Sequence, residues 1–85
     1  MKVTIRLGEP LWREVGRREV EMDVPDTTRV GDLLGAMASA YPTLRPWLDG
    51  SEVPPMVFLD EAVADPATPL REGARPMLTW ALAGG

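Results

Sequence analysis

Few residues of this chain have side chains that could do chemistry, so the candidate reactive group is a chain terminus. The sequence of 85 residues contains no cysteine and no histidine. Disulfides, thiolate nucleophiles, zinc sites of the usual ligand types and the commonest general base are thereby excluded. What remains is carboxylates, lysine, one tyrosine and the termini, and the sequence finishes on Ala83-Gly84-Gly85. We predict that the α-carboxylate of Gly85 is the working group.

The residues that lead to this carboxylate are suited to entering another protein. Ala81, Leu82, Ala83 and Gly84 precede Gly85, and most of the five have a methyl side chain or no Cβ. An extended chain rises about 3.3 Å per residue, so this segment could project the carboxylate more than about 10 Å beyond a sheet edge. We predict that Ala81, Leu82, Ala83 and Gly84 insert into a narrow channel of a partner. The alternative is an ordinary flexible terminus.

The remaining aromatic and acidic residues indicate packing and solvation. The three tryptophans are expected to contribute buried area to a small core: Trp12, Trp47 and Trp80. Asp60, Glu61 and Asp65 lack the spacing of a calcium loop and are expected to be solvated. We therefore predict no metal site and no bound cofactor.

Length and charge limit the kinds of partner. A chain of 85 residues suffices for one domain and leaves little interior for an enclosed active site. Its net charge is −4, and no basic stripe with interleaved aromatic residues suits a phosphate backbone. We expect a basic protein surface as partner, and neither nucleic acid nor a membrane. No segment approaches the roughly 20 apolar residues of a membrane span, and the start does not look like a signal peptide, so we expect a cytoplasmic protein.

The sequence predicts a hairpin followed by one main helix. Residues 2–7 and 19–24 alternate polar and apolar side chains, which predicts two strands. A single helical turn is predicted at 11–15, closed by Gly16 in a left-handed conformation. The main helix has Thr28 as its predicted N-cap. Its apolar residues fall on one face: Val30, Leu33, Leu34, Met37, Ala38 and Tyr41.

The remaining strands complete a recognisable order. A central strand is predicted at 56–59, a weaker one at 62–64 and a final strand at about 77–82. This order predicts an α+β protein with the β-grasp (ubiquitin-like) fold, in which a mixed sheet of four to five strands wraps one main helix. The first and last strands should lie parallel at its centre. Residues 1–83 form the predicted domain, and residues 84–85 are its di-glycine C-terminal tail.

A partner-binding surface is predicted on the sheet face that the helix leaves open. If Val57 faces the helix, then Met56 and Phe58 face away from it, where Met77 and Thr79 of the final strand join them. Exposed apolar patches often mark protein contacts, and methionine adapts to several partners. The alternative is that these side chains belong to the core, because a slip of one residue inverts the faces of a strand.

With these features the chain resembles the MoaD/ThiS family of ubiquitin-like sulfur carriers, which includes the small subunit of molybdopterin synthase. The resemblance covers nearly the whole chain. It rests on the opening strand, on several short segments and on the di-glycine: residues 11–16 (LWREVG), Asp32-Leu33-Leu34, Tyr41-Pro42, residues 68–73 (TPLREG) and Gly84-Gly85.

The resemblance implies a cycle of activation and transfer. A ubiquitin-activating-type enzyme would adenylate the Gly85 carboxylate with ATP, and a persulfide on a sulfur donor protein would displace AMP. Gly85 would then carry a thiocarboxylate and donate its sulfur to a synthase. The protein would be a cosubstrate rather than an enzyme, although it could count as the small subunit of a synthase. The pathway stays open between molybdopterin, cysteine, thiamine, thiolated tRNA and specialised metabolites.

Two other functions stay open. A protein modifier would join the activated Gly85 to lysines of target proteins through isopeptide bonds, as ubiquitin does. An interaction domain with an inert tail would bind through its sheet face or edge, and deletion of Gly84 and Gly85 would not change its activity.

Overall fold

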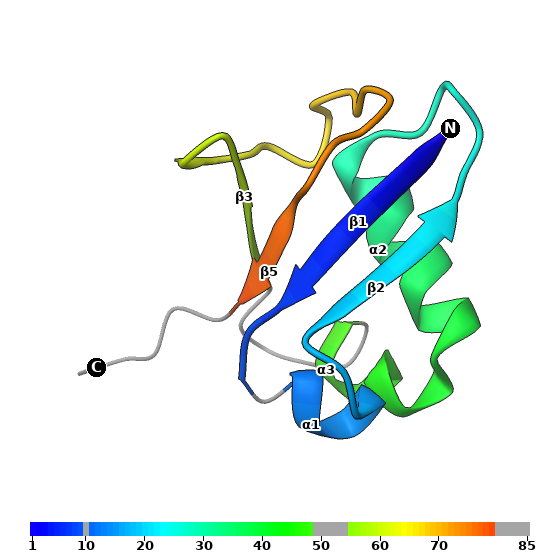
Figure 1. Ribbon diagram of the computed structural model, residues 1–85, viewed down its shortest axis with the longest axis vertical. Coiled ribbons are helices and arrows are strands. Elements are labelled where there is room, and N and C mark those ends of the chain that lie inside the picture. The colour runs from blue at the N-terminus through cyan, green and yellow to red at the C-terminus, as the bar shows by residue number, and fades with distance from the viewer. Residues whose placement is uncertain (10, 49–54, 80–85) are drawn as a thin grey trace.

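The first and last strands of the sheet lie side by side and parallel in the computed structural model, which describes residues 1–9, 11–48 and 55–79. Within these residues a five-stranded mixed sheet has the order β2-β1-β5-β3-β4. Helix α2 packs across one face of this sheet, and the other face is open (Figure 1). The predicted β-grasp architecture, with parallel strands at its centre, is confirmed.

The amino-terminal hairpin forms as its alternating sequence predicts. Strands β1 (Lys2–Leu7) and β2 (Glu19–Asp23) are antiparallel neighbours. The single turn of helix α1 (Leu11–Val15) lies between them, and Gly16 follows it with φ of 87°. A residue with a Cβ is strained in this left-handed conformation, so glycine suits the end of α1.

The carboxy-terminal half adds the other strands. Strand β3 (Met56–Leu59) pairs antiparallel with β4 (Ala62–Val63) on one side and with β5 (Met77–Thr79) on the other. The predicted strands at 56–59 and 62–64 are thus found nearly as expected. The final strand is described from Met77 to Thr79, and the rest of the predicted range 77–82 lies outside the described residues.

The main helix α2 (Val30–Ala40) begins one residue later than predicted, because Arg29 and not Thr28 is its N-cap. Thr28 is held instead by the segment after β4, since its carbonyl accepts a hydrogen bond from the Leu70 N–H at 3.0 Å. The same segment supplies carbonyl acceptors to the first turn, where the Val30 N–H donates to Thr68 at 2.9 Å. Tertiary contacts therefore satisfy donors that a side-chain cap would otherwise serve.

The core lies between α2 and the sheet. After α2, a 3-10 turn η1 (Pro42–Leu44) and helix α3 (Arg45–Leu48) close one end of the molecule, near α1 (Figure 1). Buried apolar side chains from both layers form one cluster: Val3, Ile5, Leu7, Leu11, Val20, Val24, Val30, Leu33, Met37, Leu44, Val57, Leu70 and Leu78. Among the helices described here, none has the length and apolar character needed to cross a membrane.

Candidate functional site

The predicted reactive segment follows directly on strand β5. Residues 80–85, which include the tail residues Ala81, Leu82, Ala83 and Gly84 and the proposed working residue Gly85, lie outside the described residues. The structure does describe the base from which they start, since β5 is defined as far as Thr79. The described part of the site is thus this base, formed by β5 and its neighbours β1 and β3.

Strand β5 is anchored on both sides. It pairs with β3 on one edge, while on the other the Arg6 N–H donates to the Pro76 carbonyl at 2.9 Å and the Gly8 N–H donates to the Leu78 carbonyl at 2.8 Å. The Leu78 side chain is fully buried in the core. A central strand that is paired on both edges and anchored by a buried leucine cannot shift without breaking several interactions at once. The position of Thr79 is therefore set by the fold.

Gly8 makes this anchoring possible. A Cβ atom at position 8 would lie 2.8 Å from the Thr79 Oγ1 atom and 3.2 Å from the Leu78 carbonyl oxygen. Both distances are shorter than ordinary van der Waals contacts, so a side chain at position 8 would push against the end of β5. Gly8 is not among the residues predicted from the sequence. The only sequence signal for it is a glycine directly after an alternating strand, which marks close backbone approach only weakly.

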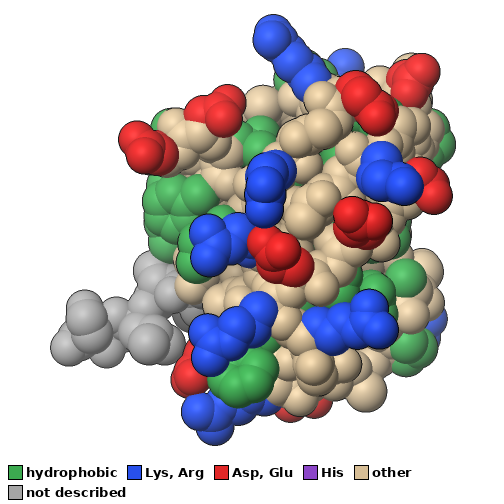
Figure 2. Space-filling view, viewed as in Figure 1, with side chains coloured by type: hydrophobic (Ala, Val, Ile, Leu, Met, Phe, Trp, Pro, Cys, Tyr) green, Lys and Arg blue, Asp and Glu red, His purple; other side chains and the backbone are tan. Residues whose placement is uncertain are grey.

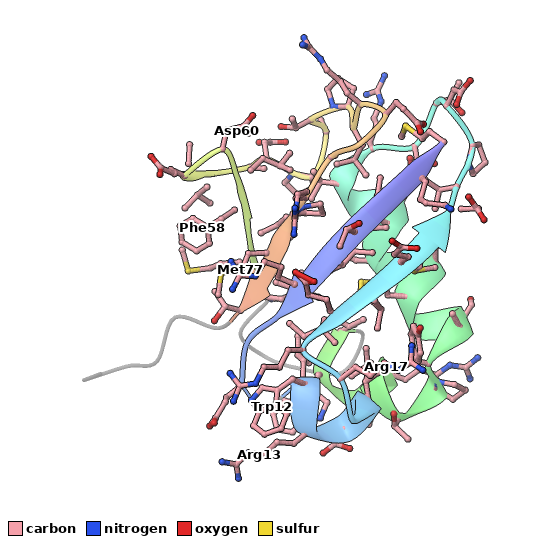
Figure 3. The ribbon with its side chains drawn as sticks, in the orientation of Figure 1. Trp12, Arg13, Arg17, Phe58, Asp60 and Met77 are labelled. Carbon is pink, nitrogen blue, oxygen red and sulfur yellow. The ribbon has the colours of Figure 1, made fainter. Side chains whose placement is uncertain are left out.

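The four predicted partner-binding residues lie on the open face of the sheet. In the register of β3 and β5, Met56 is opposite Thr79 and Phe58 is opposite Met77. Val57 and Leu78, which alternate with them, are buried toward α2, whereas Met77 remains 38% exposed. Phe58 and Met77 are seen beside each other in Figure 3. The predicted orientation of these strands is thus correct, while partner binding by Met56, Phe58, Met77 and Thr79 stays a prediction.

The structure extends this patch by one residue that sequence reasoning missed. Val63 of β4 is opposite Phe58, and its side chain is 57% exposed. A single row of cross-strand neighbours therefore crosses the whole sheet: Val63, Phe58, Met77, Arg6 and Glu19. The apolar end of this row is what we call the apolar patch, made of Val63, Phe58 and Met77 together with Met56 and Thr79. Pairing of β4 with β3 could not be inferred from a weak two-residue strand.

Within the described ranges, other chemistry-bearing groups do not gather. No group of three or more acidic side chains there is arranged to hold a metal ion. Asp60 and Glu61 are exposed at the turn between β3 and β4, as predicted (Figure 3). Trp12 and Trp47 are partly buried against the core, which agrees with a packing role, while Trp80 lies outside the described residues.

Comparison with known proteins identifies relatives by structure. No protein-family model and no curated protein sequence matches the chain. SAMP1 from Haloferax volcanii, a small archaeal modifier protein, matches with a TM-score of 0.85 and 26% identity over 100% of both chains. A molybdopterin converting factor subunit 1 from Pyrococcus furiosus matches with a TM-score of 0.80 and 15% identity, over 96% of this chain and 99% of that one.

A third structural match contains a partner. In a complex of subunits 1 and 2 of the molybdopterin-converting factor from Helicobacter pylori, the matched chain gives a TM-score of 0.67 and 22% identity, over 100% of both chains. Likeness at this level of identity concerns the fold. Small carriers, modifiers and synthase subunits thus share the architecture found here.

Proposed function

Because this chain has the ubiquitin-like fold of the MoaD/ThiS-type sulfur carriers and of small archaeal modifiers, we propose that it is a carrier protein that works through the Gly85 carboxylate. The observation that supports this proposal most is the placement of the di-glycine. Gly84 and Gly85 are the fifth and sixth residues after Thr79, which is the last described residue of a central strand that is anchored on both edges. A rigid base followed by small residues is what a tail needs to enter another active site.

The proposed chemistry needs little from the carrier itself. A carboxylate is a poor electrophile until one oxygen becomes part of a phosphate leaving group, so an activating enzyme first transfers AMP from ATP to Gly85 and releases pyrophosphate. Sulfide then attacks the carbonyl carbon, AMP leaves with the bonding electron pair, and a thiocarboxylate remains. With a protein persulfide as donor, an acyl disulfide forms first and a thiol reduces it. A chain without cysteine cannot divert this sulfur onto its own side chains.

The partners follow from this cycle. An adenylating enzyme of the ubiquitin-activating type, a persulfide donor protein and a sulfur-accepting synthase would each take up the tail in turn, while the chain itself holds no cofactor. The two-subunit converting factor of Helicobacter pylori supports a synthase as one of these partners. The acceptor is proposed to belong to molybdopterin, cysteine or another sulfur-metabolite synthesis.

The test is the intact mass of the protein after incubation with ATP, an activating-type enzyme from the same genome and a sulfide source. We expect a gain equal to one sulfur-for-oxygen exchange, mapped to Gly85, and no gain in a variant that lacks Gly84 and Gly85. Equal biological activity of the truncated variant, with no mass gain in the full chain, would instead support an interaction domain with an inert tail.

A second candidate function is protein modification, which is favoured by the likeness to SAMP1 at 26% identity. In that case the amine of a lysine attacks the activated carbonyl, AMP leaves, and an isopeptide bond forms. The chain has a single lysine, Lys2, so any adduct between two copies through a lysine side chain has to form there. Adducts on other proteins that persist under reducing denaturing conditions would support the modifier, and Lys2→Arg would remove only the self-adducts.

A further inference from the structure

A groove of about 500 Å³ lies beside the base of the tail and shares Met77 with the apolar patch described above. Its lining includes Met77 of β5, Arg6 of β1, Trp12 of α1 and Arg18. The Arg18 carbonyl accepts a hydrogen bond from the Leu7 N–H at 2.8 Å, which holds the Arg18 backbone against the end of β1. Figure 3 shows Trp12 of α1 below the end of β1. The groove therefore combines an aromatic and apolar lining with guanidinium groups.

The lining itself carries two arginines and two glutamates, and the flanking Arg13 and Arg75, which pair with these glutamates, give the surroundings an excess of positive charge. Its two carboxylates already have partners, since Glu9 pairs with Arg13 at 3.1 Å and Glu19 pairs with Arg75 at 3.2 Å. The Arg18 guanidinium has no carboxylate partner among the residues that the structure describes, and it lies 4.6 Å from the centre of the Trp12 ring. In Figure 2 several basic side chains surround a hydrophobic one in this part of the surface. An excess of positive charge thus stands next to exposed apolar surface, although the whole chain carries a net charge of −4.

The position of the groove indicates when it would be filled. Met77 lines it, and so does Gly8, whose N–H donates to the Leu78 carbonyl at 2.8 Å and which lies so near Thr79 that a side chain at position 8 would collide with it. A protein that surrounds the residues after Thr79 therefore approaches the groove as well. This surface is also continuous with the apolar patch through Met77.

We propose that this groove binds an acidic segment of the enzyme that activates Gly85, with a carboxylate on Arg18 and a neighbouring apolar side chain against Trp12 and Met77. The proposal rests on the proposed function, because it names a docking site for the same enzyme. A peptide segment fits the lining better than a free phosphate does. Phosphate sites use several converging donors, whereas this groove offers one unpaired guanidinium beside apolar walls.

The first experiment uses the full chain labelled with ¹⁵N and a synthetic hexapeptide of alternating glutamate and leucine as the probe. We expect saturable shifts of the Trp12 indole signal and of the amides of Leu7, Gly8 and Arg18, with the Trp47 indole as internal reference. Arg18→Gln should weaken peptide binding at least about fivefold, because a charge-assisted contact is lost. Arg71→Gln is the matched control, since Arg71 is exposed in a different groove.

Two further probes decide between ligand classes. A hexapeptide of alternating lysine and leucine should leave the same signals unmoved, and high salt should weaken the glutamate peptide because exposed charges are screened. Shifts produced by inorganic phosphate or by a single-stranded oligonucleotide, with none from the glutamate peptide, would overturn the proposal. So would peptide shifts spread over all exposed arginines.

The second experiment measures ATP–pyrophosphate exchange by the activating enzyme as the concentration of the chain is varied. We expect Arg18→Gln to raise the KM for the chain at least about fivefold with little change in kcat, because a docking contact away from the reacting atoms is lost. Unchanged KM values would refute docking of this enzyme in the groove. If the unaltered chain supports no ATP–pyrophosphate exchange, the proposed function is refuted instead. The peptide experiment would then test by itself whether the groove binds an acidic segment.

Discussion

At the scale of single residues, the close approach of Gly8 to Thr79 links the fold to the proposed site most directly. Gly8 has no side chain to conflict with the end of β5, so β1 can lie against the last described residues of the chain. Gly35 offers a contrast inside α2, because a Cβ atom there would meet nothing within 4 Å. Glycine is therefore needed for close packing at position 8 but not at position 35. Substitution by alanine should lower the stability at position 8 and raise it at position 35.

We expect Gly8→Ala to lower the free energy of unfolding by about 1–3 kcal/mol, because the added methyl group overpacks the end of β5. Gly35→Ala should raise it by about 0.5–1 kcal/mol, because alanine favours a helix interior. Urea unfolding followed by circular dichroism measures both. If Thr79→Gly relieves the strain of Gly8→Ala in the double variant, the Thr79 contact is its cause, whereas additive effects would place the cause elsewhere.

At the scale of elements, the β3–β4 hairpin is held together by an unfavourable turn. Its two-residue loop, Asp60-Glu61, has φ of 51° and 69°. Positive φ at both positions is the geometry of a type I′ turn, which favours Asn or Asp followed by Gly. Glu61 therefore occupies a position at which glycine would fit better. This hairpin places Val63 opposite Phe58, so the turn also determines how far the apolar patch extends.

Glu61→Gly should accordingly raise the free energy of unfolding, by about 0.5–1 kcal/mol after the larger entropy of the unfolded glycine variant is included. Glu21→Gly in β2 is the matched control. At this ordinary strand position glycine should lower the free energy of unfolding by about the same amount. Thermal and urea unfolding of the two variants give the comparison. A loss of stability in Glu61→Gly would mean that the glutamate side chain makes a contribution that outweighs its backbone strain.

At the scale of the whole molecule, the open face of the sheet determines what the protein can present to a partner. The apolar patch and the groove both lie beside the base of the tail, and Met77 belongs to both. A partner that takes up the tail therefore meets the two surfaces together. Their contributions can be separated, because Arg18 belongs to the groove alone and Val63 to the patch alone.

We expect Met77→Ser and Val63→Ser each to raise the KM for the chain in the activation assay several-fold, with a change in unfolding free energy within about 1 kcal/mol, because both side chains are exposed. Ala40→Ser, at the exposed end of α2, should leave both quantities unchanged. If both variants match the unaltered chain in KM, neither Met77 nor Val63 contributes to docking, which would contradict a docking role of the apolar patch.

The same scale explains how much the sequence could predict. Alternation and helical periodicity are local signals, so strands β1 to β3 and helix α2 were predicted almost residue by residue. The N-cap was misplaced by one residue because Leu70 and Thr68, distant in sequence, satisfy the start of α2. The groove could not be predicted because it joins Arg6, Trp12, Arg18 and Met77, which only the folded sheet brings together. Net charge pointed to a basic partner, whereas charge at this one place favours an acidic one.

The row of side chains that crosses the five strands changes from apolar at Val63 and Phe58 to charged at Arg6 and Glu19. Such a gradient makes the face directional, because a partner rotated by half a turn would set its own charges against valine and phenylalanine. Only one orientation then matches along the whole row. The sheet would thus set the orientation of a bound partner as well as bind it. The same alignment fixes the side from which the partner approaches Thr79.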